Sequence, residues 1–182
     1  MDDFVSSRES AGHAVSAKYT TGGLKLIADT YLSSKEDADV AYGVSAEYTF
    51  DEMFTLGATY QDQGNRSKKG NDYSVMGAKA GLTLGNFGAA VNYIFEDIDG
   101  ASDLDTISAA LDYQIEKVRL YTSFGFTDGD NDQEITYYTV GTDYAVSSNI
   151  SAFVEYSDYE NKADNANLVE GDAVIAGMYY TF

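Results

Sequence analysis

The chain contains no cysteine, no proline and no tryptophan, and its only histidine is His13. Without cysteine there can be no disulfide and no thiolate metal site. A lone histidine supplies neither a Ser-His-Asp triad nor a histidine-rich metal site, so we expect no enzyme, no catalytic residue and no cofactor. Basic residues are scarce, 11 against 30 acidic ones, and the formal charge is −19. This charge excludes a nucleic-acid binder that depends on phosphate contacts.

Long apolar runs are also missing, since no stretch of about 18 apolar residues occurs, which excludes a transmembrane helix. What the chain does have is 16 tyrosines, 17 glycines and a strict alternation of residue character. The alternation is clearest at the end of the chain, where side chains repeat with the period of two that is typical of a β-strand. One face would carry Val174, Ala176, Met178, Tyr180 and Phe182, and the other Ile175, Gly177, Tyr179 and Thr181.

The same alternation recurs along the whole chain and predicts eleven strands. They cover residues 12–20, 24–33, 40–50, 54–63, 73–84, 87–97, 104–115, 118–127, 134–146, 150–159 and 173–182. Most are about ten residues long, and ten residues at roughly 3.4 Å each, tilted by about 45°, span the ~25 Å apolar band of an outer membrane. We therefore predict an all-β fold, an antiparallel up-and-down transmembrane β-barrel with about eleven strands in this chain.

The connections between these stretches fall into two classes. Tight turns are predicted at residues 21–23, 51–53, 85–86, 116–117 and 147–149, and longer, more polar connections at 34–39, 64–72, 98–103, 128–133 and 160–172. Short turns on one rim and long loops on the other are typical of transmembrane barrels, with the short turns in the periplasm. Aromatic residues gather near the tight turns and predict an interfacial girdle. These residues are Tyr19, Tyr48, Phe50, Phe54, Phe87, Tyr113, Tyr144, Tyr180 and Phe182.

Two hairpins resemble those of a known family of barrel proteins. Residues Val40 to Tyr60 (VAYGVSAEYTFDEMFTLGATY) and Leu82 to Tyr93 (LTLGNFGAAVNY) resemble the Gram-negative general diffusion porins of alphaproteobacteria, the Rhodobacter type. The resemblance implies a sixteen-stranded barrel with a constriction loop after its fifth strand. This chain would hold the last eleven strands, residues 1–182 would form one partial porin-type domain, and residues 1–11 would be the tail of the constriction loop.

The same resemblance implies further roles for individual residues and partners. Arg8 and Glu9 would belong to the constriction loop, and Met178, Tyr180 and Phe182 would form the carboxy-terminal signal for outer-membrane insertion. Residues 1–11 show no charged-then-apolar signal pattern, and an odd strand count would leave the amino end outside the cell. We therefore expect a carboxy-terminal fragment or a truncated gene model. When complete, the protein would be a homotrimer surrounded by outer-membrane lipid and lipopolysaccharide.

The function implied by the resemblance is a water-filled channel for passive diffusion of ions and small hydrophilic solutes. Charged residues on the inward files are the candidates for the pore lining, because water solvates charges that lipid does not. Four are basic and six acidic, which predicts a weak preference for cations. They are Lys18, Lys25, Lys79 and Arg119, and Asp29, Glu47, Glu96, Asp112, Asp143 and Glu155.

Two alternatives remain open at this point. The acidic segment Asp128 to Asp132 has the composition of a calcium loop but lacks the bidentate glutamate of an EF-hand, so only weak Ca²⁺ binding by outer loops stays open. A soluble or surface β-sandwich adhesin or carbohydrate-binding module would show the same alternation, but with shorter strands and without a girdle.

Overall fold

The computed structural model describes residues 14–31, 40–63, 72–99, 103–130, 133–162 and 169–181, and these residues contain eleven strands. Their lengths run from 8 to 13 residues, and all eleven predicted strands are confirmed. The strands are β1 Ala14–Thr21, β2 Leu24–Tyr31, β3 Ala41–Phe50, β4 Phe54–Asp62, β5 Tyr73–Leu84, β6 Phe87–Ile98, β7 Leu104–Ile115, β8 Val118–Gly129, β9 Gln133–Ala145, β10 Ile150–Lys162 and β11 Val169–Tyr180.

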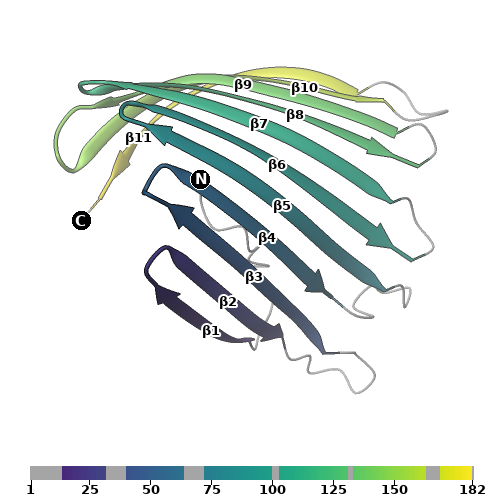
Figure 1. Ribbon diagram of the computed structural model, residues 1–182. Helices are drawn as coiled ribbons and strands as arrows, with labels where there is room; N and C mark the ends of the chain where they lie inside the picture. The colour runs from purple at the N-terminus through teal and green to yellow at the C-terminus, as the bar shows by residue number, and fades with distance from the viewer. Residues whose placement is uncertain are drawn as a thin grey trace. The chain divides into compact units, whose positions relative to one another are not determined.

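Strand order follows chain order, so that each strand is hydrogen-bonded to its neighbours in sequence from β1 to β11 (Figure 1). The chain divides into two compact units. Unit 1 comprises residues 1–80 and 93–105, and unit 2 comprises residues 81–92 and 106–182. Pairing is antiparallel in β1 to β4 of unit 1 and in β8 to β11 of unit 2. This is the up-and-down arrangement that the alternation predicts.

The tight turns lie where the sequence places them, and several need a left-handed backbone. Gly22 and Gly85 have φ of 52° and 58°, values that glycine adopts without steric cost. In the turn closed by the hydrogen bond from Met53 N to Phe50 O, Asp51 and Glu52 both have positive φ. Positive φ at both central residues matches the twist of the flanking strands and keeps the hairpin tight.

The connections after β8 and β10 are shorter than predicted, and here the sequence interpretation was wrong. Strand β10 continues to Lys162 and β11 begins at Val169, so both ends of the predicted loop 160–172 are strand. Strand β8 likewise reaches Gly129, within the predicted loop 128–133. Polar residues indicate contact with water, but they can still form a strand, because a strand requires only that its backbone N–H and C=O groups are hydrogen-bonded. The ladders therefore extend beyond the apolar residues.

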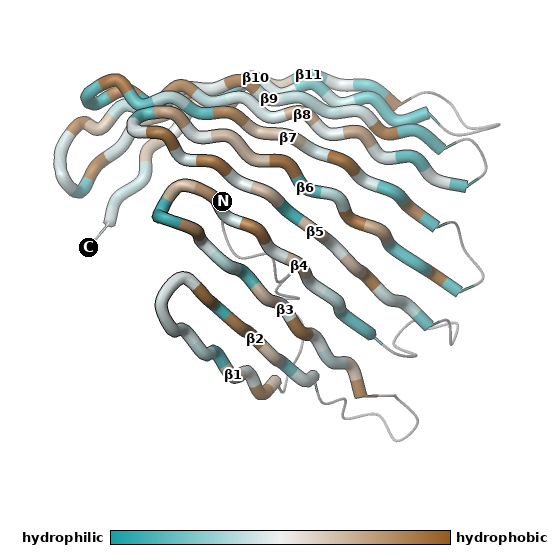
Figure 2. Tube along the Cα trace, viewed as in Figure 1, coloured by the Kyte–Doolittle hydropathy of each residue, from teal (hydrophilic) through white to brown (hydrophobic). Residues whose placement is uncertain are grey.

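Each unit has one polar and one apolar face, because paired residues of neighbouring strands share a face. The polar face of unit 1 is the one that carries Lys25 and Glu47, and the polar face of unit 2 is the one that carries Arg119 and Asp143. Figure 2 shows hydrophobic and hydrophilic residues alternating along the strands. Among the described residues no helix is long and apolar enough to cross a membrane.

The large apolar side chains are exposed rather than packed into a core. In the described part of the chain, the only buried hydrophobic residues are Tyr31 and Ala41. Side chains such as Val44, Leu56 and Val140 are half exposed or more on the apolar faces. A soluble sandwich would bury such a face against a second sheet. Continuous exposed apolar surface marks a face made for lipid or a partner.

Candidate functional site

The ten charged residues that the sequence assigns to the inward files all lie on the polar faces. In unit 1, register places Lys18 on the face of Lys25 and Asp29, and Lys25 directly opposite Glu47. Contacts across the strands add Lys79 and Glu96 to that face. In unit 2, the polar face carries Asp112, Arg119, Asp143 and Glu155. The structure thus brings the candidates together in two groups, six in unit 1 and four in unit 2.

Lys79 of unit 1 reaches across one strand to form an ion pair with Glu47. The strand between them, β4, carries Gly57 at the crossing point, where an added Cβ would lie 2.9 Å from the Cε atom of Lys79. The lysine side chain is only 10% exposed and the glutamate side chain 28%. The lysine stem therefore lies against the sheet, and its charge is neutralised at the wall.

Two acidic residues of unit 1 differ in their surroundings. Glu96 on β6 accepts a hydrogen bond from the Tyr73 hydroxyl on β5. Asp29 on β2 is 8% exposed, and neither of its carboxylate oxygens has a hydrogen-bond partner among the described residues. Gln61 and Gln63 are also buried, and the Gln63 Oε1 atom has no hydrogen-bond partner among the described residues either. This group of buried acceptors was not anticipated from the sequence.

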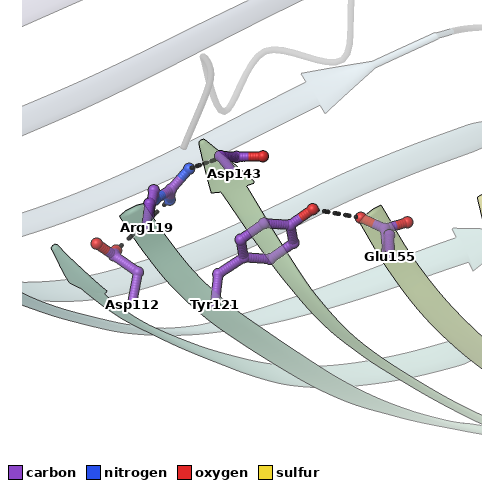
Figure 3. Close-up of polar contacts among 5 residues, drawn as sticks. All are labelled: Asp112, Arg119, Tyr121, Asp143 and Glu155. Atoms are coloured by element: carbon purple, nitrogen blue, oxygen red, sulfur yellow. Dashed lines mark hydrogen bonds and ion pairs between the residues drawn. The ribbon is translucent and has the colours of Figure 1, made fainter. Parts of the chain in front are cut away.

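Arg119 organises the polar face of unit 2 (Figure 3). Its Nη2 atom lies 3.6 Å from Asp112 Oδ1 on β7, and its Nη1 atom lies 3.7 Å from Asp143 Oδ2 on β9. The guanidinium carbon is 5.4 Å from the centre of the Tyr121 ring, within range of a cation–π contact. One cation thus stands between two carboxylates, and the group keeps a net negative charge.

Tyr121 and Glu155 form a second part of this face. The Tyr121 hydroxyl donates a hydrogen bond of 3.0 Å to Glu155 Oε2 (Figure 3). The Ser157 hydroxyl donates to Glu155 Oε1 at 3.3 Å and lies 3.1 Å from the Thr139 hydroxyl. Hydroxyl groups thereby satisfy the carboxylate without removing its charge.

Aromatic rings on the polar face of unit 2 lie over glycines of the neighbouring strand. A Cβ added to Gly141 would lie 2.4 Å from the Tyr121 ring, and one added to Gly125 would lie 2.1 Å from the Tyr137 ring. Phe153 covers Gly177 in the same way and stacks on Tyr179 with the ring centres 4.8 Å apart. The sequence reasoning missed these residues, although they share the odd numbering of Arg119, Asp143 and Glu155 on their strands.

The apolar faces carry aromatic residues at both ends of the strands. Beside the tight turns, Tyr19, Tyr48, Phe50, Phe54, Tyr113, Tyr144 and Tyr180 are exposed, as the predicted girdle requires, whereas Phe87 is half-buried. Near the long connections the structure adds two tyrosine pairs that were not predicted. Tyr42 and Tyr60 have ring centres 6.1 Å apart, and Tyr138 and Tyr156 have ring centres 5.8 Å apart. Aromatic belts at both interfaces are typical of transmembrane barrels.

Some candidates lie outside the described residues. These are His13, Arg8 and Glu9 of the predicted constriction loop, and Phe182 at the end of the chain. Met178 and Tyr180, the other residues of the predicted insertion signal, are exposed on β11. Within the described ranges, no group of three or more histidine, cysteine, aspartate or glutamate residues is arranged to hold a metal ion.

Comparisons with known proteins agree with this architecture. A family model for Gram-negative porins matches residues 3–164. A porin solved at 1.8 Å resolution aligns with a TM-score of 0.70 and 18% identity over 92% of this chain and 60% of that one. The anion-selective porin of Comamonas acidovorans aligns with a TM-score of 0.82 and 12% identity over 94% and 60%.

A third similar structure is Salmonella typhi OmpF in complex with daunomycin, with a TM-score of 0.74 and 15% identity over 91% of this chain and 61% of that one. The chain thus spans about 60% of the length of the porin structures that it matches. None of the curated proteins matches the sequence. The family model covers well over half of the chain, and the described strands have the porin fold. The chain therefore belongs to the family of Gram-negative porins, which places it in the bacterial outer membrane.

Proposed function

We propose that the protein is part of a passive channel for ions and small hydrophilic solutes, with the two polar faces lining the water-filled path. The observation that carries this proposal is the segregation of charge. All ten charged candidates lie on polar faces, while the opposite faces expose half or more of side chains such as Val44 and Val140. Lipid on one side and water on the other is the arrangement that satisfies both faces.

The charges of the polar faces support a weak preference for cations. Lys79 is neutralised by Glu47, and Arg119 faces two aspartates, so its group is net negative. Glu96 and Glu155 are held by tyrosine hydroxyls, which leave their negative charges in place. The four basic and six acidic candidates sum to −2. Fixed charges of one sign along a pore favour passage of the opposite sign.

The neighbouring structures do not decide this preference. The Comamonas acidovorans porin is described as anion-selective, yet its likeness to this chain at 12% identity concerns the fold alone. Selectivity depends on the side chains that face the water, so the charges of this chain determine its preference. The match to a porin family supports a channel rather than an enzyme. The exposed apolar faces favour this reading over a soluble adhesin.

The finer predictions from the sequence belong to this proposal. They are assembly as a homotrimer, contact with lipid and lipopolysaccharide, a constriction loop that includes Arg8 and Glu9, an insertion signal in Met178, Tyr180 and Phe182, and an alphaproteobacterial origin. Residues 1–182 as one partial domain stay a prediction as well. The exposed Met178 and Tyr180 on the last strand support the insertion signal.

Reconstitution of the full chain into planar bilayers tests the proposal. We expect stepwise ion conductance and, under a gradient of KCl, a reversal potential of the sign given by excess K⁺ permeation. A reversal potential that indicates excess Cl⁻ permeation would refute the cation preference. Release of the chain from membranes by salt or alkaline washing, without detergent, would refute the membrane-spanning reading itself.

A further inference from the structure

Two aromatic rings stack on the polar face of unit 2, among charged and hydroxyl-bearing side chains. Phe153 on β10 is paired with Asp143 on β9 and with Gly177 on β11. Tyr179 stands two residues after Gly177 and therefore shares this face. The two rings have their centres 4.8 Å apart and their planes 20° apart. We call this pair the aromatic platform.

The platform presents an open aromatic surface to the water. Gly177 lies beneath Phe153, where an added Cβ would be 2.6 Å from the ring, so the ring rests against the sheet. The Phe153 side chain has no polar atom, so a hydrogen bond does not account for its place on this face. Tyr179 is 58% exposed. An apolar surface left in contact with water is stabilised by a ligand that covers it.

A hydrogen-bond donor and an acceptor lie beside the platform. Asp143 is directly opposite Phe153, and side chains in opposite positions have Cβ atoms about 4.5–5.5 Å apart. Arg119 lies opposite Asp143 on the other side, as Figure 3 shows. Their Nη1 and Oδ2 atoms are 3.7 Å apart, longer than the about 3.2 Å of a direct hydrogen bond. The guanidinium and the carboxylate thus retain hydrogen-bonding capacity for a ligand.

We propose that the aromatic platform, Arg119 and Asp143 form a binding site for neutral sugars, which takes one pyranose ring of a small saccharide. A pyranose has C–H groups on a flat face, which pack against an aromatic ring, and hydroxyl groups at its edge, which both donate and accept hydrogen bonds. Neighbouring hydroxyls therefore use the guanidinium and the carboxylate together. An organic cation would use the rings and the carboxylate, but it offers no acceptor to Arg119.

Further rings continue along the same face. Tyr121 and Tyr137 lie over Gly141 and Gly125, and Tyr137 is the nearer of the two to the long connections. Rings that follow one another along the strands suit a chain of sugar units, so a trisaccharide should bind more tightly than glucose. The inference rests on the proposed function, because a water-filled channel is the route by which sugars reach this face.

Planar-bilayer recordings with maltotriose test the site. We expect a saturable reduction of the ion current, at lower concentration than with a polyethylene glycol of equal hydrodynamic radius, which fills the channel but has no ring. Phe153→Leu and Tyr179→Leu should each raise the half-blocking concentration about fivefold, which corresponds to about 1 kcal/mol of binding free energy. Each half-blocking concentration is read relative to the open current of the same variant, so only folded channels are compared.

Two control variants separate the ring from its position. Tyr179→Phe keeps the ring and should be blocked by maltotriose as the wild type is. Tyr144→Leu removes a tyrosine from the apolar face and should also be blocked as the wild type is. Tyr144 is paired with Ala152, next to the Ser151 partner of Tyr179, so the two tyrosines lie at nearly the same depth.

Saturation-transfer NMR of the full chain in detergent with maltotriose gives a second readout that needs no conductance. Saturation transfer to the sugar that is lost in Phe153→Leu would support the site even if the chain did not conduct, whereas conductance without block or saturation transfer would overturn the site alone. Equal block of wild type, Phe153→Leu and Tyr179→Leu would mean that the rings only cover the wall, and would overturn the proposal. Stronger block by benzyltrimethylammonium than by maltotriose, with the same dependence on the platform, would overturn the assignment to sugars.

Discussion

At the scale of single residues, the polar faces combine opposite charges at short range instead of presenting bare charges. Arg119 serves two carboxylates at 3.6 and 3.7 Å, and Lys79 lies along the wall to reach Glu47. The two basic side chains differ in burial, because that of Arg119 is 45% exposed and that of Lys79 only 10%. They should therefore have different consequences when broken. Loss of the exposed Arg119 charge should change the electrostatic potential of the pore, whereas loss of the buried Lys79 charge should change the stability of the fold.

Replacement of Arg119 by Gln should strengthen the cation preference of the channel, because Asp112 and Asp143 then lose their counter-charge. Glu155→Gln should weaken the preference, while its amide still accepts the Tyr121 hydrogen bond. Folding stability should change by less than about 1 kcal/mol for Arg119→Gln, since exposed ion pairs contribute little. Reversal potentials under a KCl gradient measure the effect, with Arg119→Lys as the control that keeps the charge. Shifts of the same sign in Arg119→Gln and Glu155→Gln would contradict the assignment.

Replacement of Lys79 by Met should reduce stability by about 1–3 kcal/mol, because it leaves Glu47 half-buried without its cation. Lys18→Met removes a charge from an exposed position on the same face and should change stability by no more than about 0.5 kcal/mol. Urea unfolding in lipid vesicles measures both. If the two variants proved equally stable, the Lys79–Glu47 pair would have no structural role.

At the scale of strands, each residue faces either lipid or water, and the choice alternates at every position. Val44 is 50% exposed on the apolar face of β3, and Ser45 follows it on the polar face, opposite Ile27 and Thr59. The two residues lie at the same depth in the membrane but meet different solvents. Neighbouring positions therefore test the assignment of faces without a change of location.

The substitution Val44→Lys should be destabilising by about 2–4 kcal/mol, the cost of a lysine on the lipid face near the midplane of the bilayer. Ser45→Lys is its matched control and should remain within about 1 kcal/mol of the wild type, because water solvates the ammonium group. The measurement is unfolding by urea from vesicles. Comparable losses in the two variants would mean that the faces have been assigned incorrectly.

All eleven strands could be predicted because lipid on one side and water on the other impose a period of two on each of them. The strand ends could not, since residues such as Asn161 and Asp172 have loop composition and yet extend the β10–β11 pairing. The alternation of residues along each strand was also enough to place the charged candidates on one face. It could not show that Lys79 crosses Gly57 or that Asp29 is buried. Those features depend on neighbouring strands and their register, which the sequence of a single strand does not contain.

At the scale of the whole molecule, the formal charge of −19 is far more negative than the −2 contributed by the ten candidates on the polar faces. Most acidic residues therefore lie elsewhere, and many stand near the ends of strands that lead to the long connections, such as Asp62, Asp97 and Asp128. Charges at a channel entrance raise the local concentration of cations before they enter. This contribution depends on ionic strength more than the paired charges of the wall do.

The cation preference should fall as salt rises, because the Debye length shrinks from about 10 Å at 0.1 M to about 3 Å at 1 M. Reversal potentials measured at a fixed KCl ratio and increasing mean concentration should move toward zero. A preference that stayed constant over this range would indicate that charges in direct contact with the ion determine it, instead of those at the entrance.

The glycines beneath Tyr121 and Tyr137 have a consequence for the size of solutes. Each ring lies flat because Gly141 and Gly125 leave room for it against the backbone. A methyl group at either position would lift its ring from the wall and into the water. In a channel, the absence of side chains at Gly141 and Gly125 would widen the pore. Gly141→Ala should therefore lower the molecular-weight cutoff for neutral polyethylene glycols without a change in charge.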